Sequence, residues 1–182
     1  MTEKTWRALC PLQQVCRTEE HLNTTVRAAH AERYHQAPMP ESVLCIPADV
    51  SRLAEVRQFI REQASHMGAD PDVTNDLILA VDELTTNSII HGYRGSLGVV
   101  EVEVGNERGS MVVWLRDHAP PFDPIKHPEP DTNLPLARRP KGGMGIYLSR
   151  GVCDSLSYRR TGDGNELTIV KRLPGPNGGG TC

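Results

Sequence analysis

The sequence predicts an α+β domain, a two-layer sandwich in which a mostly antiparallel mixed sheet carries its helices on one face. Strand hairpins alternate with helices, in the order strand, helix, helix, two strands, irregular segment, helix, two strands. The βαβ units are too few for a doubly wound parallel sheet. We therefore expect one sheet with one covered face and one face in water.

The composition suits a single domain with a sizeable core. The chain has 182 residues and a net charge of -3, and its acidic and basic residues are mixed along the sequence. This balance does not indicate a nucleic-acid or lipid surface. No apolar run approaches a membrane span, no signal-peptide pattern is visible, and five scattered cysteines fit reduced thiols. We expect a cytoplasmic protein.

Three regions are expected along the chain. Residues 1–41 form an N-terminal extension that is partly helical, because Thr18–His35 carries a narrow apolar stripe followed by prolines. The compact domain occupies residues 42–173. Residues 174–182 are rich in glycine and proline, which is typical of a disordered tail.

The domain begins with a short apolar strand, Val43–Ile46, that ends at Pro47. Ser51 is predicted to cap the helix that follows, and Gly68 lies just beyond its end. The apolar residues of this helix recur at helical spacing: Leu53, Val56, Phe59, Ile60 and Met67.

The central helix is predicted from Asp70, which can cap it, with Pro71 at the first helical position, to about Gly92. One stripe is expected to be buried, and Glu83 and Asn87 point together one turn apart on a second stripe with Asp76. A solvated polar face explains this pair as well as a site does, so the pattern alone leaves both open. The predicted buried stripe is Val73, Leu77, Val81, Leu84 and Ser88.

Two hairpins are predicted from strands joined by glycine-rich turns. Apolar and polar residues alternate strictly in Val99–Val104, so this strand is expected to have one solvent-exposed face. Met111–Arg116 is expected to pair with it across the turn at residues 105–109. Leu156–Arg159 and Leu167–Lys171 form the second hairpin around residues 162–165.

Between the hairpins, His118–Lys141 holds seven prolines, which excludes a continuous helix or central strand. An irregular segment of this length is typical of a functional loop or lid. Residues 142–145, with the sequence GGMG, then open a short helix that runs to about Val152. Glycines there let backbone amides approach a ligand, and a helix N-terminus favours phosphate.

Three features therefore need one explanation: the Glu83/Asn87 pair, Asp117 at a strand end facing the irregular segment, and the glycine cluster at a helix start. The GGMG sequence alone is weak evidence, and it matches neither the Walker A pattern nor a GxGxxG after a strand. Together the three features predict a nucleotide site between the central helix and the lid.

The segments VDELTTNSIIHGY, RDHAPPFDP and KGGMGIYL occur in this order. They resemble the three nucleotide boxes of the ATPase superfamily of gyrase, heat-shock chaperones, histidine kinases and MutL. Within it, the chain is most similar to bacterial anti-sigma-factor serine/threonine kinases, including the closing GNELTIVKRL. The resemblance covers residues 43–173 and implies the histidine-kinase-like ATPase fold.

The resemblance also implies roles for individual residues. Glu83 matches the base that polarises the attacking hydroxyl. Asn87 matches the ligand of Mg²⁺, and Asp117 matches the acceptor of the adenine amino group. The phosphates of ATP are expected at Lys141, Gly143, Met144 and Gly145. For Lys141, a place in an ordinary solvated loop is an equally good explanation.

The resemblance further implies a kinase that phosphorylates a small antagonist protein, holds a sigma factor in the antagonist's absence and thereby regulates transcription, with a homodimer as an additional expectation. Ala119 and Pro121 stand where the family usually has glycines, and this departure favours an alternative. That alternative is an ATP-binding or degenerate module that sequesters a partner without turnover. A sensor histidine kinase domain is a weaker alternative, because no dimerisation helix pair with a phospho-acceptor histidine precedes the domain.

Overall fold

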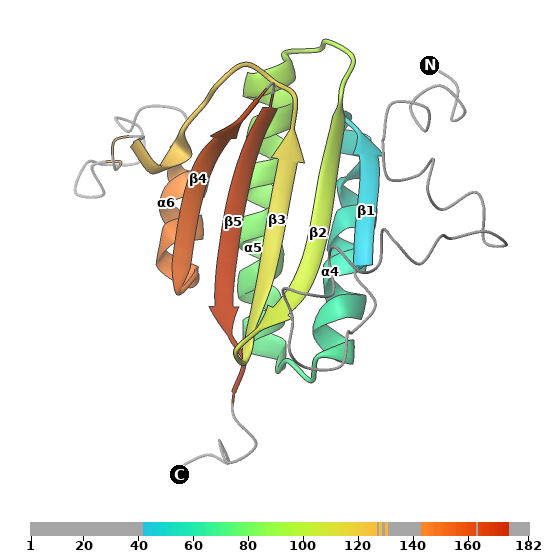
Figure 1. The fold of residues 1–182 in the computed structure, drawn as a ribbon, viewed down its shortest axis with the longest axis vertical. Helices are drawn as coiled ribbons and strands as arrows, with labels where there is room; N and C mark the ends of the chain where they lie inside the picture. The colour runs from blue at the N-terminus through green and yellow to red at the C-terminus, as the bar shows by residue number, and fades with distance from the viewer. Residues whose placement is uncertain (1–41, 127, 129, 131–142, 163, 175–182) are drawn as a thin grey trace, which may run out of the picture.

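The computed structural model describes residues 42–126, 128, 130, 143–162 and 164–174. Five strands form one sheet in the order β1-β2-β3-β5-β4, and the helices lie on one side of it (Figure 1). Every neighbouring pair of strands is antiparallel, which confirms the two-layer α+β prediction and makes the described sheet more uniform than the mixed sheet that was predicted.

The strands are β1 Ser42–Pro47, β2 Val99–Glu107, β3 Ser110–Asp117, β4 Ser155–Thr161 and β5 Gly164–Arg172. The helices are α4 Leu53–His66, α5 Pro71–Asn87 and α6 Met144–Val152, with 3-10 turns η1 Val50–Arg52 and η3 Pro124–Lys126 and the π-helix η2 Ser88–Tyr93.

The start of α4 differs from the prediction at one residue. Asp49, not Ser51, supplies the cap: its carboxylate accepts a hydrogen bond of 2.8 Å from the Ser51 backbone nitrogen at the start of η1. A single 3-10 turn then leads into α4 at Leu53. The prediction placed the cap on Ser51 because serine and aspartate are both good capping residues and the short 3-10 turn leaves no periodic signal.

The central helix begins as predicted and stays helical to Tyr93, close to its predicted end, but its last part is a π-helix. Asp70 accepts a hydrogen bond of 2.8 Å from the Val73 backbone nitrogen, and Pro71 occupies the first turn. The α-helical part ends at Asn87, and the chain continues through Tyr93 in the wider π-helical turn. Such turns are rare and are frequent at functional sites, since they shift the side chains that follow relative to the helix before them.

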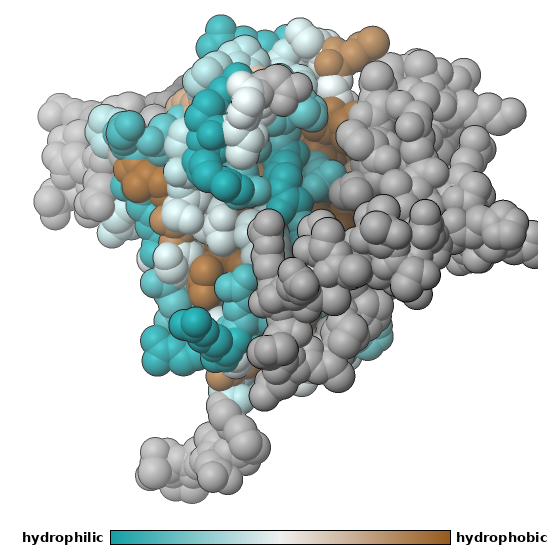
Figure 2. Space-filling model, in the orientation of Figure 1, coloured by the Kyte–Doolittle hydropathy of each residue, from teal (hydrophilic) through white to brown (hydrophobic). Residues whose placement is uncertain are grey.

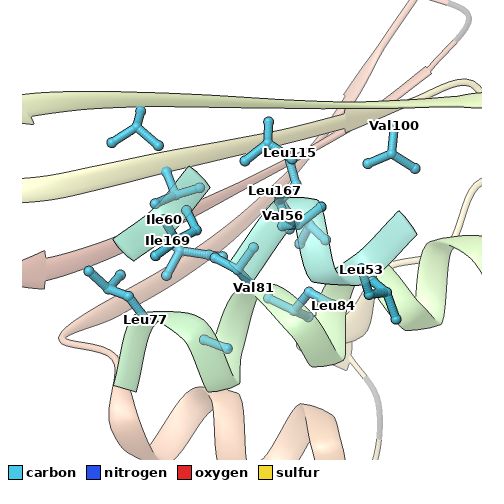
Figure 3. Packing of buried hydrophobic residues seen from close by; sticks show 14 of the residues in the cluster. Leu53, Val56, Ile60, Leu77, Val81, Leu84, Val100, Leu115, Leu167 and Ile169 are labelled. Carbon is cyan, nitrogen blue, oxygen red and sulfur yellow. The ribbon is translucent and has the colours of Figure 1, made fainter. Parts of the chain in front are cut away.

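The core lies between the helices and the sheet (Figure 3). Leu77, Val81 and Leu84 from α5 are at most 1 % exposed and meet apolar side chains of the sheet. Each fully buried side chain of this kind contributes about 1.5–3 kcal/mol relative to an exposed one. The sheet contributes the inward positions of β2, β3 and β5: Val100, Val102, Val104, Met111, Val113, Leu115, Leu167 and Ile169.

Ion pairs fix the helices at the ends of the core. The Arg57 guanidinium of α4 donates to both carboxylate oxygens of Asp82 on α5, at 2.8 and 3.1 Å. Lys171 of β5 pairs with Asp76 of α5 at 2.7 Å and donates to the carbonyl oxygen of Val152 in α6. The helix that carries the predicted site residues is thus tied to both neighbouring helices and to the sheet.

The opposite face of the sheet is polar, as the alternation in β2 predicted. Arg116 at the centre donates to Glu101 at 2.7 Å, to Glu166 at 2.7 Å and to Glu103. Burial alone lowers the pKa of Arg116, but these three carboxylates outweigh burial and raise it. Figure 2 shows that the described part of this face is mainly hydrophilic.

Several predictions fall wholly or partly outside the described residues. These are the N-terminal extension, most of the proline-rich segment and nearly all of the tail. The helices that the structure describes include none long and apolar enough to cross a membrane.

Cys45 is disulfide-bonded, so the expectation of reduced thiols is wrong at that position, whereas Cys153 is a free thiol.

Candidate nucleotide site

Asp117 lies at the end of β3 with 9 % of its surface exposed, and both of its carboxylate oxygens accept hydrogen bonds. Oδ2 accepts from the Ser88 hydroxyl at 2.5 Å. Oδ1 accepts from the Asn165 side-chain amide at 2.7 Å and from the Ala119 backbone nitrogen at 2.9 Å. A carboxylate offers about four acceptor positions, so Asp117 keeps one for a ligand.

The π-helix η2 holds the backbone that follows Asp117. The Tyr93 hydroxyl accepts from the His118 backbone nitrogen at 2.8 Å and donates to the carbonyl oxygen of Val99 at 2.7 Å. Burial raises the pKa of Tyr93, which keeps its hydroxyl protonated and able to donate. The first residue of η2 thus contacts the carboxylate of Asp117, and the last contacts the next residue of the chain.

Ala119, which replaces a glycine usual in the resembled family, is accommodated by a second glycine. Ala119 is 2 % exposed, and a methyl group built on Gly92 would lie 2.8 Å from the Ala119 Cβ. The absence of a side chain at Gly92 therefore makes the room that the Ala119 methyl occupies. Gly92 of η2 thus accommodates the Ala119 methyl, and the Ala119 backbone nitrogen donates to Asp117.

Glu83 and Asn87 lie one turn apart on α5, as predicted, and both are half-buried. Among the described residues, neither side chain makes a hydrogen bond or ion pair. Asp76, the other acidic residue on this stripe, is occupied by its ion pair with Lys171. Glu83 is therefore the carboxylate on this stripe that is available to a ligand.

The N-terminus of α6 faces Glu83. A methyl group built on Gly145 would lie 1.9 Å from the Glu83 Oε2 atom, so the missing side chain lets the carboxylate reach the helix backbone. Gly143, at the N-cap, has φ +81°, which favours glycine, and it provides no side-chain cap. Within the described residues, the first amides of α6 therefore have no N-cap side chain as acceptor, an arrangement that suits a phosphate.

A small cavity of about 20 Å³ lies beside Asp117, between α5, η2 and the segment after β3. This is room for about one water molecule. Its outer wall is built by Pro120, Phe122 and Pro124. Arg150 of α6 holds this wall in place by donating to the carbonyl oxygens of Pro124, at 2.7 Å, and Ile125. A purine is larger than this space.

The structure brings together most of the predicted site residues. Glu83 lies against Gly145 at the α5–α6 contact, with Gly143 and Met144 beside it at the start of α6, and Asn87 lines the small cavity together with Asp117. Lys141 lies outside the described residues.

Sequence reasoning missed Ser88, Tyr93 and Asn165. The helical spacing predicts Ser88 on the buried apolar stripe, but Ser88 is half-buried and donates a hydrogen bond to Asp117. Tyr93 and Asn165 gave no signal in the sequence, because their partners lie 25 and 48 residues away. A polar residue on an otherwise apolar stripe was the one available sign.

The residues present fit ATP with Mg²⁺. Asp117 retains an acceptor position for an amino group, and the start of α6, which has no side-chain N-cap, suits phosphate oxygens. Magnesium prefers oxygen ligands and takes one or two from the protein with the rest from phosphates and water. The amide oxygen of Asn87, one turn from the Glu83 carboxylate, matches that requirement.

Comparison with known proteins bears on the family and the fold. Residues 46–171 match the model of the histidine kinase-like ATPase domain. Serine-protein kinase RsbW of Bacillus cereus is 27% identical over 115 residues, 61% of this chain and 72% of the relative, and that of Bacillus thuringiensis is 26% identical over the same shares.

A solved structure supports the fold. The RsbU and RsbW domains of a Mycobacterium tuberculosis protein superpose with a TM-score of 0.56 and 20% identity. The match covers 78% of this chain and 34% of that one, so it bears on the domain and not on the whole neighbouring protein. Because the family model spans most of the described domain, the chain belongs to the histidine kinase-like ATPase domain family.

Proposed function

We propose that this chain is an ATP-dependent protein serine/threonine kinase of the anti-sigma type. It transfers the γ-phosphoryl group of ATP to a serine or threonine hydroxyl of a small antagonist protein and binds a sigma factor in the antagonist's absence. The observation that carries the proposal is the half-buried Glu83 carboxylate against Gly145 at the start of α6, one turn from Asn87. The names of the RsbW relatives support the serine specificity.

In the transfer, the acceptor oxygen forms a bond to the γ-phosphorus while the bond to ADP breaks. The hydroxyl proton goes to Glu83, and the negative charge of the phosphates lies against the α6 amides. Phosphoryl transfer needs positioning and electrostatic stabilisation more than covalent help from the protein. Asp117 would hold adenine through its amino group, and Asn87 would hold Mg²⁺.

The Mg²⁺ role is testable through Asn87. The full chain in millimolar ATP is expected to melt at a higher temperature when Mg²⁺ is added, because a ligand of the folded state stabilises it by mass action. Asn87→Ala should remove most of the Mg²⁺-dependent part and leave the metal-free part. An Asn87→Ala protein with the full Mg²⁺ response would contradict this assignment.

The competing function is a partner-binding module without turnover, which the altered first glycine box favours. The accommodation of Ala119 by Gly92 weakens that argument, because the Ala119 methyl has room and its backbone nitrogen donates to Asp117. A sensor histidine kinase domain is less well supported, since the relatives reported above are serine-protein kinases. A homodimer and a cytoplasmic location stay predictions.

Labelled ATP separates these functions. The purified chain is incubated with labelled ATP, Mg²⁺ and candidate antagonist proteins, while calorimetry measures ATP binding. Label on an antagonist serine or threonine supports the kinase. Binding without any transfer supports the module, label on a histidine supports the sensor kinase, and absence of binding rejects the nucleotide site.

A further inference from the structure

Asn165 is the side chain that links Asp117 to the far edge of the sheet. It lies at the start of β5, directly opposite Asp117 in the β3–β5 register, and is 5 % exposed. Its amide nitrogen donates to Asp117 Oδ1 at 2.7 Å and to the carbonyl oxygen of Ala119 at 3.0 Å. It also lines the small cavity, so it touches both the carboxylate and the space beside it.

The orientation of this amide is determined by β4. The Tyr158 hydroxyl donates to Asn165 Oδ1 at 2.8 Å, and the Arg160 guanidinium approaches the same oxygen at 3.2 Å. Arginine can only donate, so the oxygen of Asn165 must face Arg160 and its nitrogen must face Asp117. A chain of hydrogen bonds therefore runs from Tyr158 through Asn165 to Asp117.

The two oxygens of Asp117 are consequently not equivalent. Oδ1 accepts two hydrogen bonds, from Asn165 and from the Ala119 backbone, which fills it. Oδ2 accepts one, from Ser88, and keeps one free acceptor position. Rotation of the carboxylate would break the bonds to Oδ1, so the free position is held in one direction.

We propose that Asn165, oriented by Tyr158, is a positioning residue that sets the choice of base: it holds Asp117 so that Oδ2 receives the amino group of adenine and rejects a carbonyl oxygen in its place. The proposal rests on the proposed ATP site. A base with a 6-oxo group would place its carbonyl oxygen, an acceptor, against Oδ2 of Asp117, which is also an acceptor. Neither oxygen would then have a hydrogen-bond donor. Such sites discriminate strongly because unpaired buried polar groups are costly.

The test compares ATP with inosine triphosphate, which has an oxygen where ATP has the amino group. Calorimetry on the full chain with Mg²⁺ measures both affinities for the wild type, Asn165→Leu and Tyr158→Phe. Asn165→Leu keeps similar volume but makes no hydrogen bond, while Tyr158→Phe removes the shorter of the two hydrogen bonds to the amide oxygen and leaves that from Arg160. Thr168→Val, on the same strand but outside the cavity lining, is the matched control.

Asn165→Leu is expected to lower the preference for ATP over inosine triphosphate about tenfold, mainly through weaker ATP binding, since one net hydrogen bond to a charged group is lost. Tyr158→Phe should lower the same ratio about threefold, and Thr168→Val should leave it unchanged. Equal losses for both nucleotides would mean a purely structural role and overturn the proposal.

If Asn165→Leu does not fold, Tyr158→Phe decides, and an unchanged ratio in that variant overturns the proposal. A wild type that binds neither nucleotide rejects the proposed function itself. A wild type that binds both equally leaves the ATP site standing and rejects the base selection alone.

Discussion

The two ends of the proposed site differ in how their side chains are held. At the base end, Asp117 accepts hydrogen bonds from Ser88, Asn165 and the backbone, and the Tyr93 hydroxyl binds the next residue. At the phosphate end, Glu83 and Asn87 make no side-chain hydrogen bond within the described part of the chain. The side chains at the base end are therefore held by hydrogen bonds within the fold, whereas those at the phosphate end are available to ligands.

This difference has a physical meaning. Base recognition requires an acceptor in a fixed direction, and neighbouring donors provide it while also contributing to stability. Transfer chemistry requires groups that bind the reactants instead of each other. Substitutions at the base end should thus affect stability and binding together, whereas those at the phosphate end should affect turnover with little effect on stability.

The largest expected effect is at the phosphate end. Glu83→Gln keeps the shape of the side chain but removes the basic carboxylate, so transfer should fall about 10²–10⁴-fold. ATP affinity and melting temperature should stay near those of the wild type, because Glu83 makes no hydrogen bond among the described residues. Glu62→Gln, an exposed position on α4, is the control. Undiminished transfer by Glu83→Gln would contradict the role of Glu83.

The next effect is at the base end. Asp117→Ala leaves the Ser88 hydroxyl and the Ala119 backbone nitrogen without their acceptor, which should cost about 1–3 kcal/mol of unfolding free energy. ATP binding should be lost in the same variant. Denaturant unfolding and calorimetry measure the two quantities. Asp72→Ala, exposed in the first turn of α5, should cost less than about 1 kcal/mol.

An Asp117→Ala protein with wild-type stability would remove the contrast between the two ends. If the Asp117→Ala protein is destabilised but binds ATP normally, Asp117 has a structural role only and is not part of the nucleotide site.

The smallest effect concerns the contact between α6 and Glu83. In Gly145→Ala the added methyl would lie 1.9 Å from Glu83 Oε2, and the flexible end of that side chain must move. We expect transfer to fall about tenfold and stability to change by less than about 1 kcal/mol, since alanine also favours the helix. The same substitution at Gly151, later in α6, meets no atom within 4 Å and should leave transfer unchanged.

A large loss of stability in Gly145→Ala would show that Glu83 cannot move, and that the phosphate end is as rigid as the base end. Transfer assays and thermal melts on the two glycine variants measure this directly.

Local patterns predicted much of the fold. The helical spacing of Leu77, Val81 and Leu84 identified the buried face of α5, and the alternation in β2 identified the wet face that carries Glu101 and Glu103. Glu83 and Asn87 were found in the same way, because residues four apart on a helix point together. These features depend on neighbours within about one or two turns, so the sequence by itself determined them.

The surroundings of Asp117 were decided by the tertiary structure. Ser88 was placed with the apolar residues because its spacing matches theirs, and the π-helical turn that begins there has no periodic signature. Asn165 reaches Asp117 through the β3–β5 register, 48 residues away in the chain. Hydrogen bonds between distant residues depend on which strands pair and in what register, and no local pattern in the sequence encodes that.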